Sequence, residues 1–331
     1  MAGRRCACLE YVGTRQRDTP DKDVPMVLSL PFAARLRIIA KTLVVQCCLF
    51  VGLIILIWGL QRGYALLDRT TFPDPMPVPA EAASLGETQK GKLLIDAVTY
   101  RMRAELDSLF GWTFNDVLFN RVLLDNRAYR QYGVFHATKA LMDLYSVTIA
   151  KLGSNDKESP FLYQARMNGF AIDPRSFMFP SAEGAYEKAL KLVDKYKASL
   201  DDGSGSFNCR TDDIYAAFSL ITGEYLLGYA IGLLEDVANE PFYTLDNHVY
   251  EVQGIVLVVR DFISTLAQLY PETVRNKNSG KDLDMAMRYL TAICTYDPLI
   301  ITSTFNSGEV ILADLTFAKA RLEDVRSSIR M

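Results

Sequence analysis

The hydrophobic positions of this 331-residue chain follow two different patterns. A continuous apolar run without any charged residue extends over Thr42–Leu60. From about residue 88 onward, apolar residues recur at three- and four-residue steps, which is the spacing of one buried helix face. Clusters of Gly, Pro, Asn, Asp and Ser separate these periodic segments and mark loops. The pattern therefore predicts an apolar helix that is followed by an all-α domain.

The periodic segments predict a series of helices whose starts carry Asp, Asn or Ser. The side-chain oxygens of these residues accept backbone N–H bonds at helix N-termini, so we expect them to be N-caps. Strand patterns are few, and Leu299–Thr302 is one short example. The predicted helices span residues 88–110, 125–152, 182–200, 211–238, 246–270, 282–295 and 307–329.

The run Thr42–Leu60 is long enough to cross a bilayer as one helix, because about 20 residues at about 1.5 Å each match a hydrocarbon core of about 30 Å. Arg35, Arg37 and Lys41 precede it, whereas the basic residues after it are partly offset by acidic ones. The positive-inside rule then places the N-terminus in the cytoplasm and the domain across the membrane. A cleaved signal peptide would have a shorter apolar region followed by small residues, so we expect an uncleaved anchor.

Charge is unevenly distributed along the chain. Residues 1–41 carry eight basic and four acidic residues, which gives a basic lead of +4 and leaves −7 for the remainder of a chain whose net charge is −3. A mildly acidic domain argues against nucleic acid as a partner. Met26 is an alternative start, because residues 26–41 alone retain the basic flank of the apolar run.

Proline alternates with other residues over Phe72–Pro79. Proline fixes φ and biases its predecessor toward extended backbone, so this segment predicts a semi-rigid stalk. A proline-rich ligand for another protein is the alternative. The chain thus divides into a basic lead (1–41), a transmembrane anchor (42–60), a stalk (61–87) and the two parts of a helical domain (88–210 and 211–331).

A second membrane span is a competing interpretation of Ile214–Leu234. This segment has a single charged residue, Glu224, and Gly228 and Gly232 have the spacing of close-packed membrane helices. A central Glu and several Gly make insertion unfavourable. We therefore favour a buried helix of the domain whose small residues admit a neighbouring helix.

The two parts of the domain resemble each other in sequence. The pattern D-N-x-x-Y-x-x-x-G occurs at Asp125–Gly133 and again at Asp246–Gly254, 121 residues later. Asp-Pro recurs at residues 173 and 297 and Ser-x-Glu at residues 181 and 307, in the same order. An ordered set of matches predicts an internal duplication, and hence a bundle of two similar four-helix repeats.

The repeated motif has a structural and a functional interpretation. In the first, which we favour, Asp and Asn cap helices while Gly133 and Gly254 permit close helix contact. In the second, the motifs meet at a pseudo-twofold axis and their Asp and Tyr side chains line a shared pocket. Trp112, Arg127 and Arg130 have no counterparts in the second part, which indicates either a binding face for an anionic or aromatic group or a solvated helix surface. Candidate ligand- or partner-binding residues are Trp112, Asp125, Arg127, Tyr129, Arg130, Asp246 and Tyr250.

Residues that usually carry catalysis are scarce. The chain has two His, His136 and His248, and it contains no sequence motif of a zinc protease, serine hydrolase, P-loop or dinucleotide site. We predict no catalytic residue, no cofactor and no metal site. Cys209 and Cys294 are the Cys of the main domain, and they are either free thiols or, outside the cytoplasm, a disulfide.

The segments GWTFND (111–116) and DNRAYRQYGVFH (125–136) resemble those of an uncharacterised bacterial family of single-span proteins with a helical domain. The likeness covers most of residues 43–331. It implies a bacterial inner-membrane location and brings no catalytic residues. We expect a membrane-anchored periplasmic scaffold or adaptor of the envelope. Its expected partners are the bilayer and an envelope protein, and this role is compatible with a homo-oligomer. A module that binds a lipid or cell-wall fragment and a carboxylate-dependent hydrolase or lyase are the alternatives.

Overall fold

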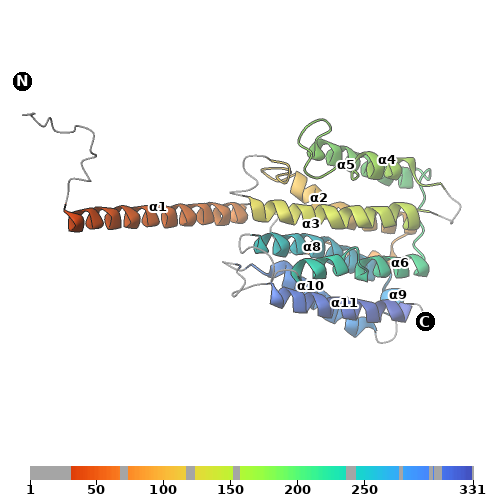
Figure 1. Cartoon of the computed structure of the whole chain (residues 1–331). Coiled ribbons are helices and arrows are strands. Elements are labelled where there is room, and N and C mark those ends of the chain that lie inside the picture. Colours follow the sequence, from red (N-terminus) through yellow and green to blue (C-terminus); the bar gives the residue numbers. More distant parts are fainter. Residues whose placement is uncertain are drawn as a thin grey trace, which may run out of the picture. The chain divides into compact units, whose positions relative to one another are not determined.

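The fold was analysed in a computed structural model, and the chain divides into two units, residues 1–58 and 59–331. Within the described residues the secondary structure is helical and contains no strand, which confirms the all-α prediction (Figure 1). The predicted strand Leu299–Thr302 lies outside the described residues except for Ile301. The described residues are 31–67, 74–116, 124–151, 157–235, 244–275, 279–297, 301 and 308–329.

Helix α1 (Phe32–Leu67) contains the predicted anchor and extends beyond it at both ends. Its large apolar side chains are exposed, and none of the span Phe32–Leu60 is buried against the protein. An apolar helix of this length has no favourable environment in water and is long enough to cross a bilayer. The helix therefore fits the membrane anchor that the sequence predicts.

The remaining helices follow the predicted ranges to within a few residues, with two exceptions. Helix α4 was not predicted, because it is short and only Leu162 and Ala165 of it are buried. The first part of the domain contains η3 (Ala82–Ser84), α2 (Glu87–Leu106), α3 (Asp125–Leu144), the π-helical turn η4 (Tyr145–Ile149), α4 (Pro160–Asn168) and α5 (Ala182–Asp201). The second part contains α6 (Thr211–Thr222), α7 (Leu227–Glu235), α8 (Leu245–Leu269), α9 (Pro271–Val274), α10 (Ser279–Thr295) and α11 (Glu309–Ile329).

The second exception is the predicted helix 211–238, which is broken into α6 and α7. Gly223 adopts extended backbone between them, and its carbonyl accepts the N–H of Gly228 at 3.0 Å. The expected helix contact at Gly232 is wrong, since a side chain added there would meet no atom within 4 Å. Thr211–Glu235 and Leu245–Leu269 are both long and apolar enough to cross a membrane. However, 44% of the most apolar 18 residues of the first segment and 89% of those of the second are buried inside the domain.

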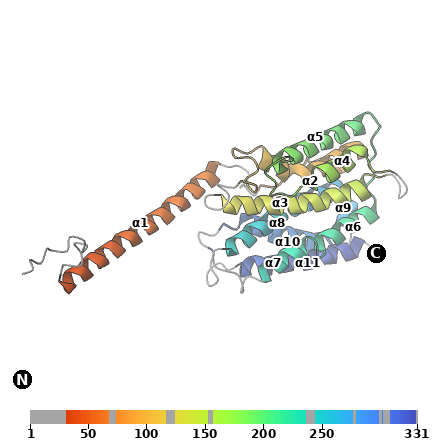
Figure 2. The ribbon, with the colours of Figure 1, turned by 45° about the horizontal axis from the view of Figure 1, so that its top comes forward.

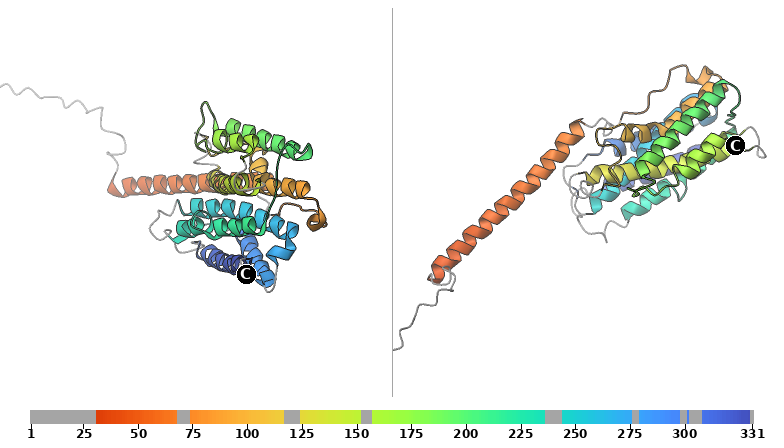
Figure 3. Two further views of the ribbon diagram at one scale, coloured as in Figure 1. Left: turned by 90° about the vertical axis from the view of Figure 1, so that its right-hand side faces the viewer. Right: turned by 90° about the horizontal axis from the view of Figure 1, so that it is seen from above.

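Helices α3 and α8 lie in the middle of the domain and begin at the same end (Figures 1 and 2). They pack against each other over most of their length. Helices α4 and α5 cover one side of this pair, and α10 and α11 cover the other, as two further views show (Figure 3). The sequence of α8 is apolar around most of its circumference, which suits a helix with neighbours on every side.

Candidate functional site

Helices α3 and α8 cross so closely that the backbone of each lies against a glycine of the other. A Cβ atom on Gly133 would lie 1.9 Å from the carbonyl oxygen of Glu251, and one on Gly254 would lie 2.1 Å from that of Arg130. The two contacts are reciprocal, because Arg130 and Glu251 each precede the glycine of their own helix by three residues. The close contact predicted at these glycines is therefore present, and it leaves no room for any larger residue.

On one side of this crossing, buried donors surround the carboxylate of Glu105 from α2, which is 2% exposed. Its Oε1 accepts a hydrogen bond from Arg130 Nε at 3.0 Å, and its Oε2 accepts one from Gln131 Nε2 at 3.1 Å. Arg127 Nη2 lies 3.4 Å from the same Oε2 and donates to the carbonyl oxygens of Glu105 and Gly111. Arg127 and Arg130, which the sequence analysis selected as binding residues, are thus buried in an internal ion-pair network.

The loop that contains Trp112 is attached to α3 by hydrogen bonds. Gln131 Oε1 accepts both the backbone N–H of Thr113 at 2.8 Å and its hydroxyl at 2.9 Å. Trp112 is 1% exposed, donates its indole N–H to the carbonyl of Pro174 at 2.9 Å, and meets the ring of Tyr186 edge-on. Trp112 is accordingly a core residue that joins two loops.

Asp125 and Asp246 lie in the first turns of α3 and α8. The prediction that they are N-caps is wrong, because the residues before these helices occupy the N-cap positions, and Asp246 Oδ1 instead accepts the N–H of Asn247 at 3.1 Å. Burial raises the pKa of both carboxyl groups, and burial together with the charge of Asp125 raises the pKa of Asp246 to about 6. The structure thus brings this predicted pair together.

The two tyrosines of the repeated motif have different surroundings. Tyr129 packs edge-on against Phe114 with 5.8 Å between the ring centres. Tyr250 is half-buried on the first turns of α8.

A carboxyl group that the sequence analysis did not select lies on α8, three residues before Gly254. Glu251 is 4% exposed, and its Oε1 accepts the hydroxyl hydrogen of Tyr229 from α7 at 2.6 Å. The ring of Tyr229 stacks on His136 of α3, which also stacks on Tyr225 and donates its Nε2–H to the carbonyl of Tyr225 at 2.8 Å. Burial raises the pKa of Glu251 to about 7, although the hydrogen bond from Tyr229 and the charge of Arg175 oppose the shift.

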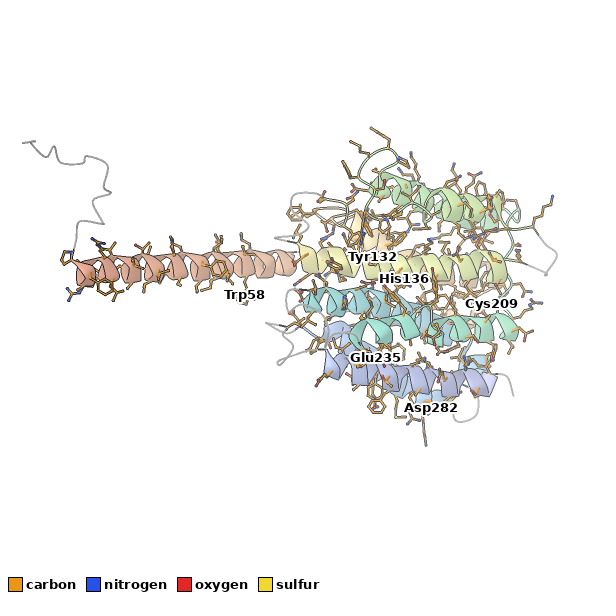
Figure 4. All side chains as sticks on the ribbon, in the orientation of Figure 1. Trp58, Tyr132, His136, Cys209, Glu235 and Asp282 are labelled. Atoms are coloured by element: carbon orange, nitrogen blue, oxygen red, sulfur yellow. The ribbon has the colours of Figure 1, made fainter. Side chains whose placement is uncertain are left out.

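Tyr132 extends this cluster toward the loop before α5. Its ring stacks on that of Phe114 with 4.9 Å between the ring centres. The guanidinium carbon of Arg175 lies over the same Phe114 ring, 5.8 Å from its centre. Burial and the charge of Glu251 raise the pKa of Tyr132. Tyr132 and His136 come from the same stretch of α3 (Figure 4). We call the surface formed by Tyr132, His136, Tyr225, Tyr229, Arg175 and Glu251 the aromatic face.

Cys209 and Cys294 are both free. Cys209 lies near Glu87 at the start of α2, whereas Cys294 lies near Arg101, 14 residues further along the same helix. These positions are about 21 Å apart along a helix, and a disulfide requires Cα atoms within about 7 Å. The fold therefore does not bring the two thiols together, and burial raises their pKa to about 12 and about 11.

The pKa of Glu251 makes the stability of the domain depend on pH. Because folding raises this pKa from an ordinary 4.5 to about 7, the folded state holds a proton that the unfolded state releases, and stability falls as pH rises through this range. We expect Glu251→Gln, which stays neutral, to be more stable than the wild type by up to about 3 kcal/mol at pH 8 and to lose this advantage near pH 4.5. Thermal unfolding of the full chain in detergent micelles at several pH values measures the difference.

The matched control is Glu323→Gln, which removes a half-exposed carboxylate from α11. Its difference from the wild type is expected to stay within about 1 kcal/mol at every pH. A Glu251→Gln variant whose stability changes with pH as much as that of the wild type would show that another group titrates.

These features define an all-α protein with an N-terminal helix long and apolar enough to span a membrane. A model of the family DUF2333, an uncharacterized protein conserved in bacteria, matches residues 36–228, which is more than half of the chain, so the chain belongs to this family. The match confirms the likeness to an uncharacterised bacterial family that the sequence suggested. No curated protein and no solved structure matches the chain.

Proposed function

We propose that this protein is a membrane-anchored scaffold or adaptor of the bacterial envelope, with its helical domain on the periplasmic side of the inner membrane. The exposed apolar surface of α1 supports the anchor. The basic residues Arg35, Arg37 and Lys41 immediately before the apolar run support a cytoplasmic N-terminus, since positive charge is retained on that side.

We infer further that the domain consists of two copies of one four-helix unit. In the first part α2 packs on α3 and α5, and α4 packs on α5; in the second part α7 packs on α8, α6 and α7 pack on α11, and α10 packs on α11. The reciprocal contacts of Gly133 and Gly254 agree with the 121-residue offset of the repeated motif. A twofold axis through the crossing of α3 and α8 accounts for both observations.

The observation that carries the adaptor role is the aromatic face. Tyr and Arg are enriched at the centres of protein interfaces, where they supply a large rigid contact with a polar end. Tyr225 is 53% exposed, and Tyr132 and Tyr229 are partly exposed beside it. Arg175 adds a positive charge beside these rings, and buried Glu251 fixes the Tyr229 hydroxyl; a charge at the edge of an interface helps to orient a protein partner.

Site-specific photo-crosslinking in living cells tests this proposal. A photoreactive amino acid at Tyr225 of the full chain should yield a discrete adduct with a second envelope protein. The same substitution at Tyr163 of α4, which is similarly exposed at 49%, should not. Protease added to spheroplasts should digest the adduct, because the domain lies outside the inner membrane.

Two results would count against the proposal. If Tyr225 gives no adduct beyond the level at Tyr163, the aromatic face is not a partner site. If the adduct resists external protease as well as a cytoplasmic marker does, the domain lies in the cytoplasm.

A further inference from the structure

Two loops of the domain join into one surface where α2 ends and α5 begins. Trp112 of the loop after α2 donates to the carbonyl of Pro174, and Asn115 Nδ2 donates to that of Ser176 at 3.0 Å. Gly111 lies directly against the side chain of Glu183 in the first turn of α5. Residues 107–116 and 173–180 are therefore held together by contacts at several points.

This surface exposes large apolar side chains. Each is at least half exposed, and the side chain of Phe179 is fully exposed. The loop is internally hydrogen-bonded, since Asp173 Oδ1 accepts the N–H of Arg175 at 2.8 Å and Ser176 Oγ donates to the carbonyl of Pro180 at 2.7 Å. Exposed apolar groups on a fixed loop indicate an interaction site. We call Leu109, Phe110, Phe177, Met178 and Phe179 the apolar loop patch.

We propose that the apolar loop patch inserts into the surface of the bilayer that α1 crosses, an inference that rests on the proposed anchor. The chain enters the domain close to this patch, because Arg101 Nη2, near the end of α2, donates to the carbonyl of Asp74. Asp74 follows Leu60, the end of the apolar run, by 14 residues. Helix α1 includes the first seven of these residues and ends at Leu67, so the remaining seven span at most about 25 Å when fully extended, and the patch is within reach of the membrane.

The tether favours lipid over a soluble partner. A short connection between the anchor and the domain keeps the bilayer at a high effective concentration, so a weak insertion is enough for stable docking. Phe, Leu and Met side chains gain free energy at the boundary of headgroups and acyl chains without needing a shaped pocket opposite them. Arg175, which lines the shallow hollow beside Phe177 and Met178, adds a cation suited to lipid phosphate groups.

Docking of this kind would also serve the adaptor role. Arg175 belongs both to the aromatic face and to the hollow beside the patch. A patch held in the headgroup region would therefore keep the aromatic face at a constant height above the bilayer.

Quenching of tryptophan by brominated lipids tests the insertion. The background is the full chain with Trp58→Phe, in which the buried Trp112 is the one remaining tryptophan. The probe variant adds Phe179→Trp to this background. In vesicles whose lipids are brominated along the acyl chains, we expect the added emission to fall about twofold, because an inserted side chain reaches about 5–10 Å into the boundary region. Met178→Trp in the same background should give the same loss.

The control is Tyr163→Trp in the same background, a similarly exposed aromatic position on α4. Arg166, on the same helix as Tyr163, pairs with Asp143 of α3. Asp143 lies 18 residues after Asp125, the first residue of α3, which is about 27 Å along the helix axis. Emission from this variant should not change with bromination. Phe179 is fully exposed, so its replacement removes no internal packing, and an unchanged thermal unfolding curve verifies this.

The outcomes separate the patch from the anchor. The insertion is overturned if bromination changes the emission of Phe179→Trp no more than that of Tyr163→Trp. It is also overturned if the emission shifts to the blue with increasing protein concentration in detergent, because that shift would indicate contact between two copies. In the unmodified chain, Trp58 reports the anchor itself. If Trp58 is also not quenched, the anchor and the proposed function fail together with the patch.

Discussion

Replacement of Gly133 or Gly254 with alanine should each destabilise the domain by about 4 kcal/mol, at the upper end of the cost of overpacking a core. The added methyl group would lie about 2 Å from a backbone carbonyl oxygen of the facing helix, and a backbone atom cannot rotate away as a side chain can. The two central helices would have to separate along their whole contact. Alanine gains about 1 kcal/mol in helix propensity over glycine, so the loss of packing decides the sign.

Gly232→Ala is the matched control, because Gly232 also lies within a helix but has open space where its side chain would be. We expect this variant to be unchanged or slightly more stable. Thermal unfolding of the full chain in detergent micelles, followed by far-ultraviolet circular dichroism, should show a decrease of about 8–16 °C for Gly133→Ala and Gly254→Ala and no decrease for Gly232→Ala.

The double variant tests whether the two glycines belong to one contact. Once a first methyl group has separated the helices, the second meets less resistance, so the loss for Gly133→Ala with Gly254→Ala should be clearly smaller than the sum of the single losses. Similar costs for the two single variants would agree with the proposed duplication. Strict additivity would mean that the helices yield locally at each glycine and do not move as a pair.

The periodic pattern was sufficient to predict most of the helices, because their buried faces recur at helical spacing over 15 or more residues. It failed where the pattern was too short or too uniform. Helix α4 buries only two apolar side chains, and the apolar segment that became α6 and α7 carries no change of pattern at its break. Gly223 ends α6 through backbone geometry, and a lone glycine in an apolar segment does not reveal whether the helix continues.

The candidate site was only partly accessible to sequence analysis. The repeated motif located the crossing of α3 and α8, since its glycines were recognisable as positions of close contact. Arg127 and Arg130 were assigned to a binding surface because a single sequence does not tell which helix lies beside them. The buried acid that pairs with them, Glu105, carries no local signal of its burial.

The aromatic face had a recognisable signal that was not used. Tyr132 and His136 are four residues apart on one helix, so they lie on one side of it, and Tyr225 and Tyr229 have the same spacing in the sequence although Tyr225 precedes the first residue of α7. Glu251 was not selected from the sequence. What the sequence does not contain is the packing of α7 beside the central helices, which stacks His136 between the two tyrosines and gives Glu251 its partner.

The polar side chains at the crossing give its two sides different properties. Arg130 and Glu251 occupy matching positions relative to the two glycines, but Arg130 joins a buried ion-pair network, whereas buried Glu251 accepts the hydroxyl hydrogen of the partly exposed Tyr229. The first side fixes the loop after α2. The second side leaves the ring of Tyr225 exposed and those of Tyr132 and Tyr229 partly exposed. A rigid frame with one open polar side is suited to holding a partner in a defined orientation.

Glu105→Gln should destabilise the domain by about 3–5 kcal/mol, because it removes the buried carboxylate that Arg127 and Arg130 share. The new amide would also direct N–H donors toward groups that are themselves donors. Asp194→Asn is the matched control, since its pair with Arg103 of the same helix α2 is exposed at the surface. That variant should lose less than about 1 kcal/mol.

The loss in Glu105→Gln should depend on the arginine charge and not on the size of the side chain. Adding Arg130→Met, which replaces a buried cation with an apolar side chain of similar length, is expected to recover part of the lost stability, because one of the two buried cations that shared the Glu105 carboxylate is removed. Chemical unfolding of the full chain in micelles measures each step. If Glu105→Gln costs no more than Asp194→Asn, or if Arg130→Met deepens the loss, water compensates these charges and the network does not hold the loop of Trp112 on α3.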